Sequence, residues 1–540
     1  METIQIPWKS VGQLVEKASL ENGHKTFLIF EGQNLGYADA NKRINRIANT
    51  LRRFGAGKGD RISVMLPNGF DFPLTWLAIA KLGAVMVPTN VTYKEHDLEY
   101  ILNDSESSLM LIHNECVPLL ERVRPDIKGL KQVLVTDCKS STYKSFADEV
   151  ENASEEFHIE DVGLDDLLNI QYTSGTTGFP RGCMLTHEYW MLLGKDMYDM
   201  FKPQPDDVDL TAQPFSYMDG QWNVAMCMMA GIPLVIMPKF SVSKFWPTVH
   251  QCNVTFFYVL GAMPAYLLSR GEDELEKTHN VRMVACSAIV PELHATLERR
   301  FNCPWRETFG MTESGCGLFV PFDDTDCVGS GAMGKPAPTK EAKVVDNDGN
   351  DVPDGEVGEL ILRGQGLMLG YWKKPEATRE VFRDGWLRTG DLAFKDEKGY
   401  FHWVGRLKDM VRRSGENIST AEVEGVLVQH EKVKVAAVLP VPDPMRGEEG
   451  KAYLILKDAE SKETVSPQEI VEFARTKLAP FKVPRYIEYV TDLPRTPSER
   501  VEKHKLLKAT QDLRLDSYDA EQGIWITQEI IDKGKGKKGS

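Results

Sequence analysis

The chain has 540 residues, which at roughly 150 residues per domain predicts several compact units, each able to bury a hydrophobic core. Apolar residues make up 42% and charged residues 26% of the chain, and these values exclude a wholly disordered or fibrous protein. The net charge of −15 argues against a general nucleic-acid or anionic-membrane binder, because polyanions select basic surfaces.

Targeting and redox signals are also absent from the sequence. The nine cysteines are scattered without a C-x-x-C pair, which indicates buried thiols in a reducing compartment. Residues 1–10 lack the basic start and apolar core of a signal peptide. The longest apolar stretches, 72–91 and 224–237, are interrupted by Lys81 or by glycine and proline, so neither predicts a membrane-spanning helix. We therefore expect a cytoplasmic protein.

Helical and strand patterns alternate over most of the first four hundred residues. In chain order they predict a helix at 39–54, a strand at 61–66, a helix at 74–82 that Gly83 ends, and a strand at 84–87 that Pro88 ends. The same helix–glycine–strand–proline order recurs at 223–238. This alternation predicts parallel sheets covered by helices on both faces, in two similar doubly wound α/β subdomains. A chance similarity of the two stretches is the alternative.

The pattern changes after about residue 320. Short strand-like runs at 344–345, 359–363 and 400–404 are separated by Asp-Gly and Lys-Gly turns, which predicts a small antiparallel, β-barrel-like unit over 321–404. A smaller α+β domain is predicted to begin at Gly405, with helices at 420–429 and 468–477 and strands at 433–441 and 485–490. The residues after Asp532 are only Lys, Gly and Ser, and we expect them to form a disordered tail.

The most informative segment reads Tyr172-Thr-Ser-Gly-Thr-Thr-Gly-Phe-Pro-Arg181-Gly182. A strand-like run ends at Tyr172, and residues 189–197 can form a helix. Glycines bring main-chain N–H groups close to a ligand, and the hydroxyl groups of Ser174, Thr176 and Thr177 add donors. The segment therefore predicts a cradle for phosphate oxygens. It is neither a Walker loop nor a dinucleotide G-x-G-x-x-G motif.

This segment resembles the phosphate loop of the adenylate-forming superfamily, which contains acyl-CoA synthetases, firefly-type luciferases and peptide-synthetase adenylation domains. Further motifs follow in that family's order: Phe309-Gly-Met-Thr-Glu313, Thr389-Gly-Asp391, Gly405-Arg-Leu-Lys408-Asp, Ser414-Gly-Glu-Asn-Ile-Ser and Ala421-Glu-Val-Glu. The resemblance covers roughly residues 10–510. It implies a large N-terminal domain (1–404), a hinge (405–409), a mobile C-terminal domain (410–512) and a tail (513–540).

The resemblance implies an ATP-dependent carboxylic acid–CoA ligase. The acid attacks the α-phosphorus of ATP to give an acyl-adenylate and pyrophosphate, and the thiol of CoA then displaces AMP. The implied ATP and AMP contacts are Thr173, Ser174, Gly175, Thr176, Thr177, Gly178, Arg181, Phe309, Gly310, Met311, Thr312, Asp391 and Arg406. Phe309 stacks on adenine, Asp391 accepts hydrogen bonds from the ribose, and Glu313 holds Mg²⁺, which prefers carboxylate oxygen.

The resemblance also assigns the C-terminal domain a moving part. Lys408 stands at the hinge about which that domain rotates between the two steps, and a plain linker is the alternative. Arg412, Arg413 and Gly415 follow on the side that CoA approaches. The acyl group is implied to lie near Tyr217, Trp222, Gly261, Ala285 and Met311.

Three positions depart from the family pattern. The phosphate loop ends in Pro180-Arg181-Gly182, where the family usually has lysine, and arginine keeps the positive charge. The catalytic lysine position near the C-terminus holds Arg500, with Lys503 nearby. Arg500 can substitute directly, Lys503 can move in, or the first step is impaired. Tyr217 replaces a common histidine, and it either donates to a polar substrate, closes the pocket, or is a core aromatic.

The identity of the acid stays open. Lys239-Phe-Ser, Phe245-Trp246 and Arg413-Ser-Gly-Glu-Asn417 resemble the carnitine/crotonobetaine-CoA ligase subgroup. No aromatic-Asp signature of amino-acid activation is present, and no carrier-protein pattern follows residue 510, which favours free CoA as the acceptor. The alternatives are an enzyme that loads a separate carrier protein and a nucleotide- or acyl-CoA-binding pseudoenzyme that lacks the usual lysine. Sequence gives no basis for an oligomeric state, so a homo-oligomer stays open.

Overall fold

The computed structural model describes residues 3–138, 142–173, 180–261, 263–407, 410–413, 416–443, 445–457, 464–495, 501–510 and 512–536. The chain divides into two compact units. The first holds Met1–Ala342 and Leu362–Leu387, and the second holds Lys343–Ile361 and Arg388–Ser540. Within the described part of the chain, no helix combines the length and the apolar character needed to cross a membrane.

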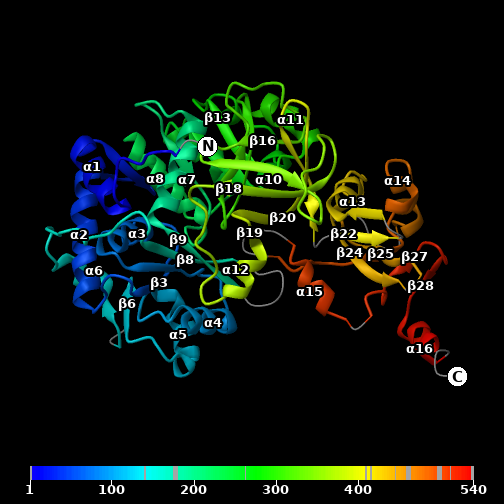
Figure 1. The fold of residues 1–540 in the computed structure, drawn as a ribbon, viewed down its shortest axis with the longest axis horizontal. Helices are drawn as coiled ribbons and strands as arrows, with labels where there is room; N and C mark the ends of the chain where they lie inside the picture. The colour runs from blue at the N-terminus through cyan, green and yellow to red at the C-terminus, as the bar shows by residue number, and fades with distance from the viewer. Residues whose placement is uncertain are drawn as a thin grey trace. The chain divides into compact units, whose positions relative to one another are not determined.

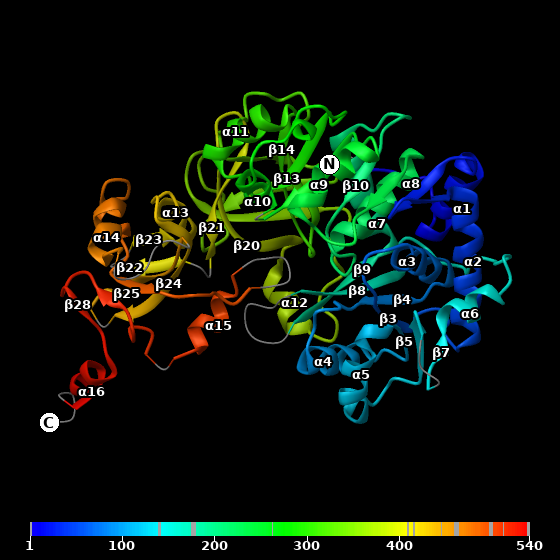
Figure 2. The same cartoon turned by 180° about the vertical axis from the view of Figure 1, so that it is seen from behind.

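One sheet of the first unit has the strand order β7-β6-β5-β3-β4-β8-β9, and its neighbours are parallel except β8 and β9. Successive side chains of a strand point to opposite faces. Met65 and Met110 pack with α4 and α5, whereas Val64 and Leu111 belong to the core that contains α1, α2 and α3. Both views show α4 and α5 on the opposite side of these strands from α2 and α3 (Figure 1 and Figure 2). The elements are α1 (Val11–Asn22), α2 (Tyr37–Arg53), β3 (Arg61–Met65), α3 (Asp71–Leu82), β4 (Val85–Pro88), α4 (Glu95–Ser105), β5 (Leu109–His113), α5 (Val117–Val123), β6 (Gln132–Thr136), β7 (Lys144–Ser145), α6 (Phe146–Glu151), β8 (Leu167–Thr173) and β9 (Arg181–Thr186).

A second run of strands in this unit has the order β16-β15-β14-β13-β12-β10-β11-β1-β2. The strands from β14 to β1 are parallel, and β15, β16 and β2 pair in the antiparallel sense. Phe257 and Val284 pack with α9 and α11, whereas Phe256 and Ala285 pack with the core of α7 and α8. The elements are β1 (Thr26–Phe30), β2 (Gln33–Gly36), α7 (His187–Phe201), β10 (Asp209–Thr211), α8 (Met218–Ala230), β11 (Leu234–Ile236), α9 (Val242–Gln251), β12 (Phe256–Leu260), α10 (Met263–Ser269), β13 (Met283–Ser287), α11 (Pro291–Phe301), β14 (Trp305–Met311), β15 (Gly315–Phe319), β16 (Ala332–Pro336), α12 (Pro375–Val381) and β19 (Phe382–Arg383).

These two layered sheets confirm the predicted fold class. Helix α3 ends at Gly83, whose φ of 68° places it in the left-handed region, and β4 follows at once. Helix α8 ends in the same way at Gly231, with φ of 65°, before β11. The repeated helix–glycine–strand order of the sequence thus marks equivalent corners of two doubly wound subdomains.

The β-rich segment of the second unit corrects one part of the prediction. Its strands follow the order β17-β18-β20-β21, and among the described strands this path does not close on itself. The segment is therefore an open sheet and not the expected barrel-like unit. Residues 343–361 and 388–404, which the sequence assigns to the N-terminal domain, lie in the second unit. The strands are β17 (Lys340–Val345), β18 (Gly358–Gly364), β20 (Trp386–Lys395) and β21 (Phe401–Arg406).

The C-terminal part of the second unit has its own sheet and core. The strand order is β23-β22-β25-β26-β27-β28, and β24 pairs with β25. Val423 of α13 and Ile470 of α14 pack with Val438 and Leu454 of the sheet. The elements are β22 (Met410–Arg413), β23 (Glu416–Ser419), α13 (Thr420–Leu427), β24 (Val433–Asp443), β25 (Gly447–Leu456), α14 (Pro467–Arg475), β26 (Tyr486–Tyr489) and α15 (Lys503–Lys508).

The segment predicted as a tail is more ordered than its composition indicates. Tyr518–Asp519 forms β27, which pairs with β26, and Ile524–Trp525 forms β28. Helix α16 (Gln528–Gly536) continues past Asp532, where the sequence predicted disorder to begin. Residues 518–525 are thus part of the C-terminal sheet.

Candidate active site

Three parallel strands of the first unit end side by side and give the site its frame. The chain leaves β12 at Gly261, with φ of 58°, and leaves β13 at Ala288, with φ of 70°. Strand β14 lies next to β13 and ends at Phe309–Met311. Ligands of open α/β sheets bind at the carboxyl ends of the strands. Gly261 and Met311, predicted on the acyl side, and Phe309, predicted at the adenine, therefore lie at one edge of one sheet.

The structure places three of the predicted acyl-group residues on or against β12 and β13. Ala285 is buried on β13 opposite Tyr258 of β12. The ring of Trp222 meets the ring of Tyr258 edge-on, with centroids 5.6 Å apart. The main-chain N–H of Gly261 donates to the carbonyl of Ser287 at 3.3 Å. The sequence reasoning missed Tyr258; its place in the β-strand run 256–260 was the one available signal.

Tyr217 and Thr312 are linked to this edge by helix α8. Tyr217 is the residue before α8, and its neighbour Met218 is the first residue of the helix. The hydroxyl of Thr312 donates to the sulfur of Met218 at 3.8 Å. Tyr93 lies near Tyr217, and burial together with this second phenol raises the pKa of Tyr93. Thr312, one of the implied ATP and AMP contacts, thus lies against the first residue of α8, directly after Tyr217.

The aromatic-Gly-x-Thr-Glu motif forms the end of a β-hairpin. Strands β14 and β15 pair Met311 with Gly315, and a bulge falls between Phe309 and Gly310. A Cβ atom at Gly310 would lie 2.7 Å from the carbonyl oxygen of Gly315, so only glycine fits there. Phe309 and Met311 remain half-buried at this bulge. The bulge therefore fixes an aromatic ring at the strand end, next to a main chain that a ligand can approach.

Glu313 is held by residues from another part of the chain. The hydroxyl of Tyr371 donates to Oε1 of Glu313 at 2.8 Å, and the main-chain N–H of Met368 donates to the Glu313 carbonyl at 2.9 Å. Cys183 lies beside this carboxylate, and burial together with Glu313 raises the pKa of the thiol. The guanidinium of Arg181 lies over the Tyr371 ring, 5.3 Å from its centroid. Tyr371 is a second residue that the sequence reasoning missed.

The predicted phosphate cradle spans a strand-to-strand connection. Thr173 ends β8 and pairs with Arg181, which begins β9, and the Thr173 hydroxyl donates to the Arg181 carbonyl at 3.4 Å. Ser174, Gly175, Thr176, Thr177 and Gly178 lie outside the described residues. So do Lys408, Gly415, Arg500 and the side chain of Arg412. Their roles stay predictions.

In the second unit, Asp391 lies on β20 opposite Arg406 of β21. Asp391 is almost fully buried, and its Oδ1 lies 3.1 Å from Nε of Arg406. The indole N–H of Trp403 donates to the same oxygen at 3.0 Å. The carboxylate of Glu359 accepts the main-chain N–H of Gly390 at 3.1 Å. These contacts orient the carboxylate, and Trp403 is a third residue that the sequence reasoning missed.

Lys503 begins α15 and has two partners in the same unit. Its ammonium group donates to the hydroxyl of Thr420 at 2.8 Å and lies 2.7 Å from Oε1 of Glu424. The side chain is 17% exposed. Its positive charge is therefore balanced locally by Glu424.

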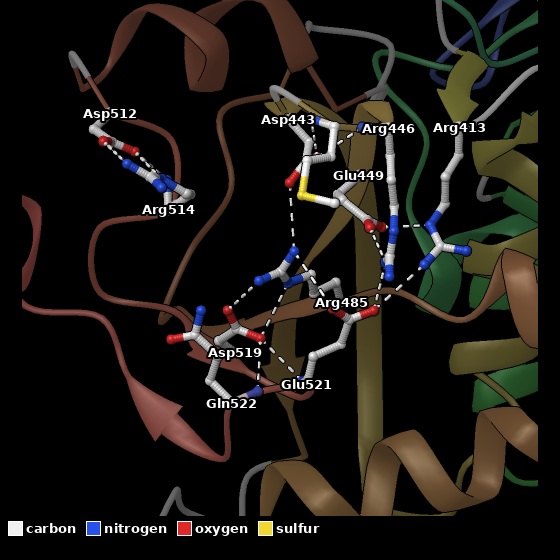
Figure 3. Close-up of polar contacts among 11 residues, drawn as sticks. Arg413, Asp443, Arg446, Glu449, Arg485, Asp512, Arg514, Asp519, Glu521 and Gln522 are labelled. Atoms are coloured by element: carbon white, nitrogen blue, oxygen red, sulfur yellow. Dashed lines mark hydrogen bonds and ion pairs between the residues drawn. The ribbon is translucent and has the colours of Figure 1, made fainter. Parts of the chain in front are cut away.

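Arg413, predicted on the CoA side, belongs to a network of three arginines and four acids (Figure 3). Its Nε donates to the buried carboxylate of Glu449 at 2.6 Å, and Glu449 also accepts from Arg446 at 2.5 Å. Glu521 of the C-terminal extension lies between Arg413, Arg446 and Arg485. The guanidinium of Arg413 is thus already paired.

The described residues contain no cluster of three or more Asp, Glu, His or Cys side chains able to bind a metal ion by themselves. All nine cysteines are free thiols, and six of them are buried. The donor set at this site is therefore one of single carboxylates, such as Glu313, combined with hydroxyl groups and arginines.

Comparison with known proteins gives matches over nearly the whole chain. Residues 15–372 match the family model described as AMP-binding enzyme, and residues 422–500 match its C-terminal domain. Crotonobetaine/carnitine–CoA ligase of Salmonella typhi is 31% identical over 90% of this chain and 96% of its own length, and that of Proteus mirabilis is 30% identical over 92% and 98%. An anthranilate CoA ligase solved with anthranoyl-AMP superposes with a TM-score of 0.86 at 26% identity, covering 94% and 99% of the chains. ATP-bound MatB from Rhodopseudomonas palustris gives 0.85 at 28%, covering 93% and 99%.

Proposed function

Because the chain belongs to the family of AMP-binding enzymes and is an AMP-forming acid–CoA ligase, we propose that its acid and ATP meet at the carboxyl edge of β12, β13 and β14. The observation that supports this placement is the set of contacts that joins Trp222 and Tyr258, through Ser287, to Thr308, directly before Phe309. Holding both reactants at one edge removes most of the entropic cost of their encounter.

The nucleotide contacts of this proposal are those that the sequence predicts. Phe309 stacks on adenine, and the Thr312 hydroxyl contacts the α-phosphate. Asp391, oriented by Arg406 and Trp403, accepts hydrogen bonds from the ribose hydroxyls. The segment from Thr173 to Gly178 and the guanidinium of Arg181 hold the phosphates. Attack of the acid's carboxylate on the α-phosphorus of ATP then depends mainly on the positioning of the reactants and on neutralisation of the phosphate charge.

We also propose that Glu313 holds Mg²⁺. This ion takes one or two carboxylates and completes its shell with water and substrate phosphates, so a single oriented glutamate fits it. The hydrogen bond from Tyr371 fixes the carboxylate in the way that outer partners usually orient metal ligands. The bound ion would neutralise phosphate charge. The protein's own contribution is to hold the carboxylate at the end of β14.

Among the two cations that the sequence leaves open for the first step, we propose Arg500. Lys503 is engaged by Thr420 and Glu424, so its charge is already neutralised. A guanidinium at position 500 keeps a full positive charge at any pH of interest and can bridge two oxygens. Lys503 acts instead by holding the start of α15 against α13, directly after the segment that carries Arg500.

For the acid we propose a compact molecule that packs on aromatic faces, with a quaternary ammonium group as the first choice. Trp222 and Tyr258 provide such faces, and the small Ala285 lies opposite Tyr258 on β13. Aromatic faces attract quaternary ammonium groups through their quadrupole, and they also stack on aromatic rings. The relatives named crotonobetaine/carnitine–CoA ligase and anthranilate CoA ligase act on one acid of each kind.

A pyrophosphate-release assay tests these assignments. The panel contains crotonobetaine, carnitine, benzoate, anthranilate and straight-chain acids, each with and without CoA. We expect pyrophosphate release with crotonobetaine and carnitine. We expect a thioester to form only when CoA is present. Pyrophosphate release without formation of a CoA thioester would indicate that the acyl group passes to a separate carrier protein. Binding of AMP without pyrophosphate release for any acid would indicate a pseudoenzyme.

A matched variant tests the acyl assignment. Trp222→Leu removes the aromatic face but keeps an apolar side chain, so we expect the KM for the acid to rise about tenfold. The KM for ATP should stay unchanged. An unchanged KM for every accepted acid would contradict the placement of the acyl group beside Trp222.

We propose a cytoplasmic location, which the nine free thiols support.

A further inference from the structure

Ala288 holds a backbone conformation that alanine rarely adopts. Its φ of 70° lies in the left-handed region, where a Cβ atom approaches the following carbonyl. It lies directly after β13, between the acyl-side residue Ala285 and the first turn of α11. Such conformations persist only where surrounding contacts impose them, and they cluster at functional sites.

The contact that imposes this conformation is the carboxylate of Glu307 on β14. Its Oε1 accepts the N–H of Ala288 at 2.6 Å, and its Oε2 accepts the N–H of Ile289 at 2.7 Å. The side chain is buried, and burial raises the pKa of Glu307 while the two main-chain hydrogen bonds lower it by favouring the carboxylate. Both oxygens are thus committed to successive amides of one loop.

The same loop is attached to β14 a second time. The hydroxyl of Tyr258 donates to Oγ of Ser287 at 2.9 Å, and the hydroxyl of Ser287 donates to the carbonyl of Thr308 at 2.7 Å. Ser287–Ile289 is therefore joined to two consecutive residues, Glu307 and Thr308, directly before Phe309. The Tyr258 ring extends this connection to Trp222.

We propose that Glu307 is a positioning residue for the nucleotide: it holds the strained main chain at Ala288 and Ile289 next to the strand end that carries Phe309, and so it sets the affinity for the adenosine part of ATP and AMP. This inference rests on the proposed function, because it takes Phe309 as the adenine contact. Glu307 does not touch the reacting atoms. Its effect belongs to nucleotide binding and not to the chemical step.

The first test is Glu307→Gln. Glutamine has the same length but offers one acceptor, and its amide N–H₂ opposes one of the two main-chain N–H groups. We expect the Kd for AMP and the KM for ATP to rise about tenfold. The kcat at saturating ATP should stay within about twofold of wild type, and the KM values for acid and CoA should not change. Glu292→Gln, an exposed glutamate on the adjacent helix, is the matched control and should behave as wild type.

The second test is rescue by Ala288→Gly. Glycine adopts the left-handed conformation without strain, so the loop no longer depends on the carboxylate to impose it. In the Glu307→Gln background this change should recover about threefold of the lost AMP affinity, and alone it should be close to neutral. A role that is only structural predicts no such recovery.

A milder variant keeps the inference testable if Glu307→Gln does not fold. Ser287→Ala removes only the second attachment of the loop, and we expect the KM for ATP to rise about threefold with kcat unchanged. The inference is overturned if Ser287→Ala and Glu307→Gln leave nucleotide affinity unchanged, or if both lower kcat without changing the KM for ATP. Failure of the wild type to bind AMP would contradict the proposed function itself, so the two failures are distinguishable.

Discussion

Lys503 already has two partners, and this has a measurable consequence for which residue supplies the charge in the first step. Lys503 donates to Thr420 and pairs with Glu424. If Arg500 is the cation of the first step, Arg500→Ala should lower the rate of pyrophosphate release by about 100-fold or more, the usual effect of removing a group that stabilises developing charge. Arg500→Lys should retain most of the rate, because it restores the charge.

Lys503→Met should have a different signature. It removes one partner of Glu424, which also accepts the main-chain N–H of Val438 at 2.6 Å. We expect a lower free energy of unfolding for the C-terminal unit and at most a few-fold loss of pyrophosphate release. A 100-fold loss in Lys503→Met with normal stability would show that Lys503, and not Arg500, delivers the charge.

Tyr371 affects the reaction through a single hydroxyl group. Its hydrogen bond to Glu313 orients the carboxylate that we propose for Mg²⁺. Loss of such an outer contact typically weakens metal binding by about tenfold or more. We therefore expect Tyr371→Phe to raise the Mg²⁺ concentration for half-maximal pyrophosphate release about tenfold. Tyr143→Phe removes a tyrosine–glutamate hydrogen bond outside the site, to Glu121, and should leave the Mg²⁺ dependence unchanged.

Asp209 gives the first unit a pH-dependent stability. The carboxylate is fully buried, and burial raises its pKa to about 8. The folded protein therefore keeps this proton up to about pH 8, whereas the unfolded chain loses it near pH 4. The protonated side chain of Asp209 therefore makes its full contribution to the free energy of unfolding below pH 4, and this contribution is lost as the pH rises through 8. Between pH 7 and 9 the loss is about 1.4 kcal/mol.

Asp209→Asn removes this group, so its free energy of unfolding should fall less than that of the wild type between pH 7 and 9. Urea titrations at both pH values measure the difference. Equal pH slopes in the two proteins would show that Asp209 does not hold its proton in this range.

At the scale of elements, the sequence predicts the helices and strands of the first unit well because their signals are local. Gly83 and Gly231 end α3 and α8 in the left-handed conformation that glycine favours, and buried strands follow. The open sheet at β17–β21 was not predictable, because turn signals predict hairpins but not whether the sheet closes. Tyr258, Tyr371 and Trp403 were missed for a related reason. Tyr258 and Tyr371 reach their partners through pairing between segments that are distant in the chain, whereas Trp403 depends on the register of the β20–β21 hairpin, which turn signals do not give.

The C-terminal extension shows how tertiary contacts override composition. Nε and Nη2 of Arg485 lie 3.1 and 2.8 Å from the two oxygens of Asp519, which is 1% exposed in β27. Glu521, two residues later, is 42% exposed. Breaking a buried ion pair leaves an uncompensated charge and costs about 3 kcal/mol, whereas an exposed pair contributes less than about 1 kcal/mol.

Asp519→Ala should therefore destabilise the C-terminal sheet by about 3 kcal/mol, and Glu521→Ala should have little effect. Hydrogen exchange at the amides of β26 and β27 measures both, because these strands pair directly. Equal protection in the two variants would show that the extension contributes nothing to the stability of this sheet.

At the scale of the whole molecule, each unit has its own hydrophobic core, so we expect two separable unfolding transitions. Tryptophan fluorescence should report mainly the first unit. The fully buried tryptophans Trp76, Trp190, Trp246 and Trp305 lie there, whereas Trp403 and Trp525 of the second unit are 43% and 41% exposed. Far-UV circular dichroism reports both units.

Asp519→Ala should then shift the circular dichroism curve to lower urea concentration and leave the midpoint of the fluorescence curve unchanged. Asp209→Asn should affect the other transition, because Asp209 lies in the first unit. At pH 9 it should raise the midpoint of the fluorescence curve relative to wild type and leave the transition of the second unit unchanged. If each substitution moved both curves together, the chain would unfold as a single cooperative unit, because the stability of one core would then depend on the other.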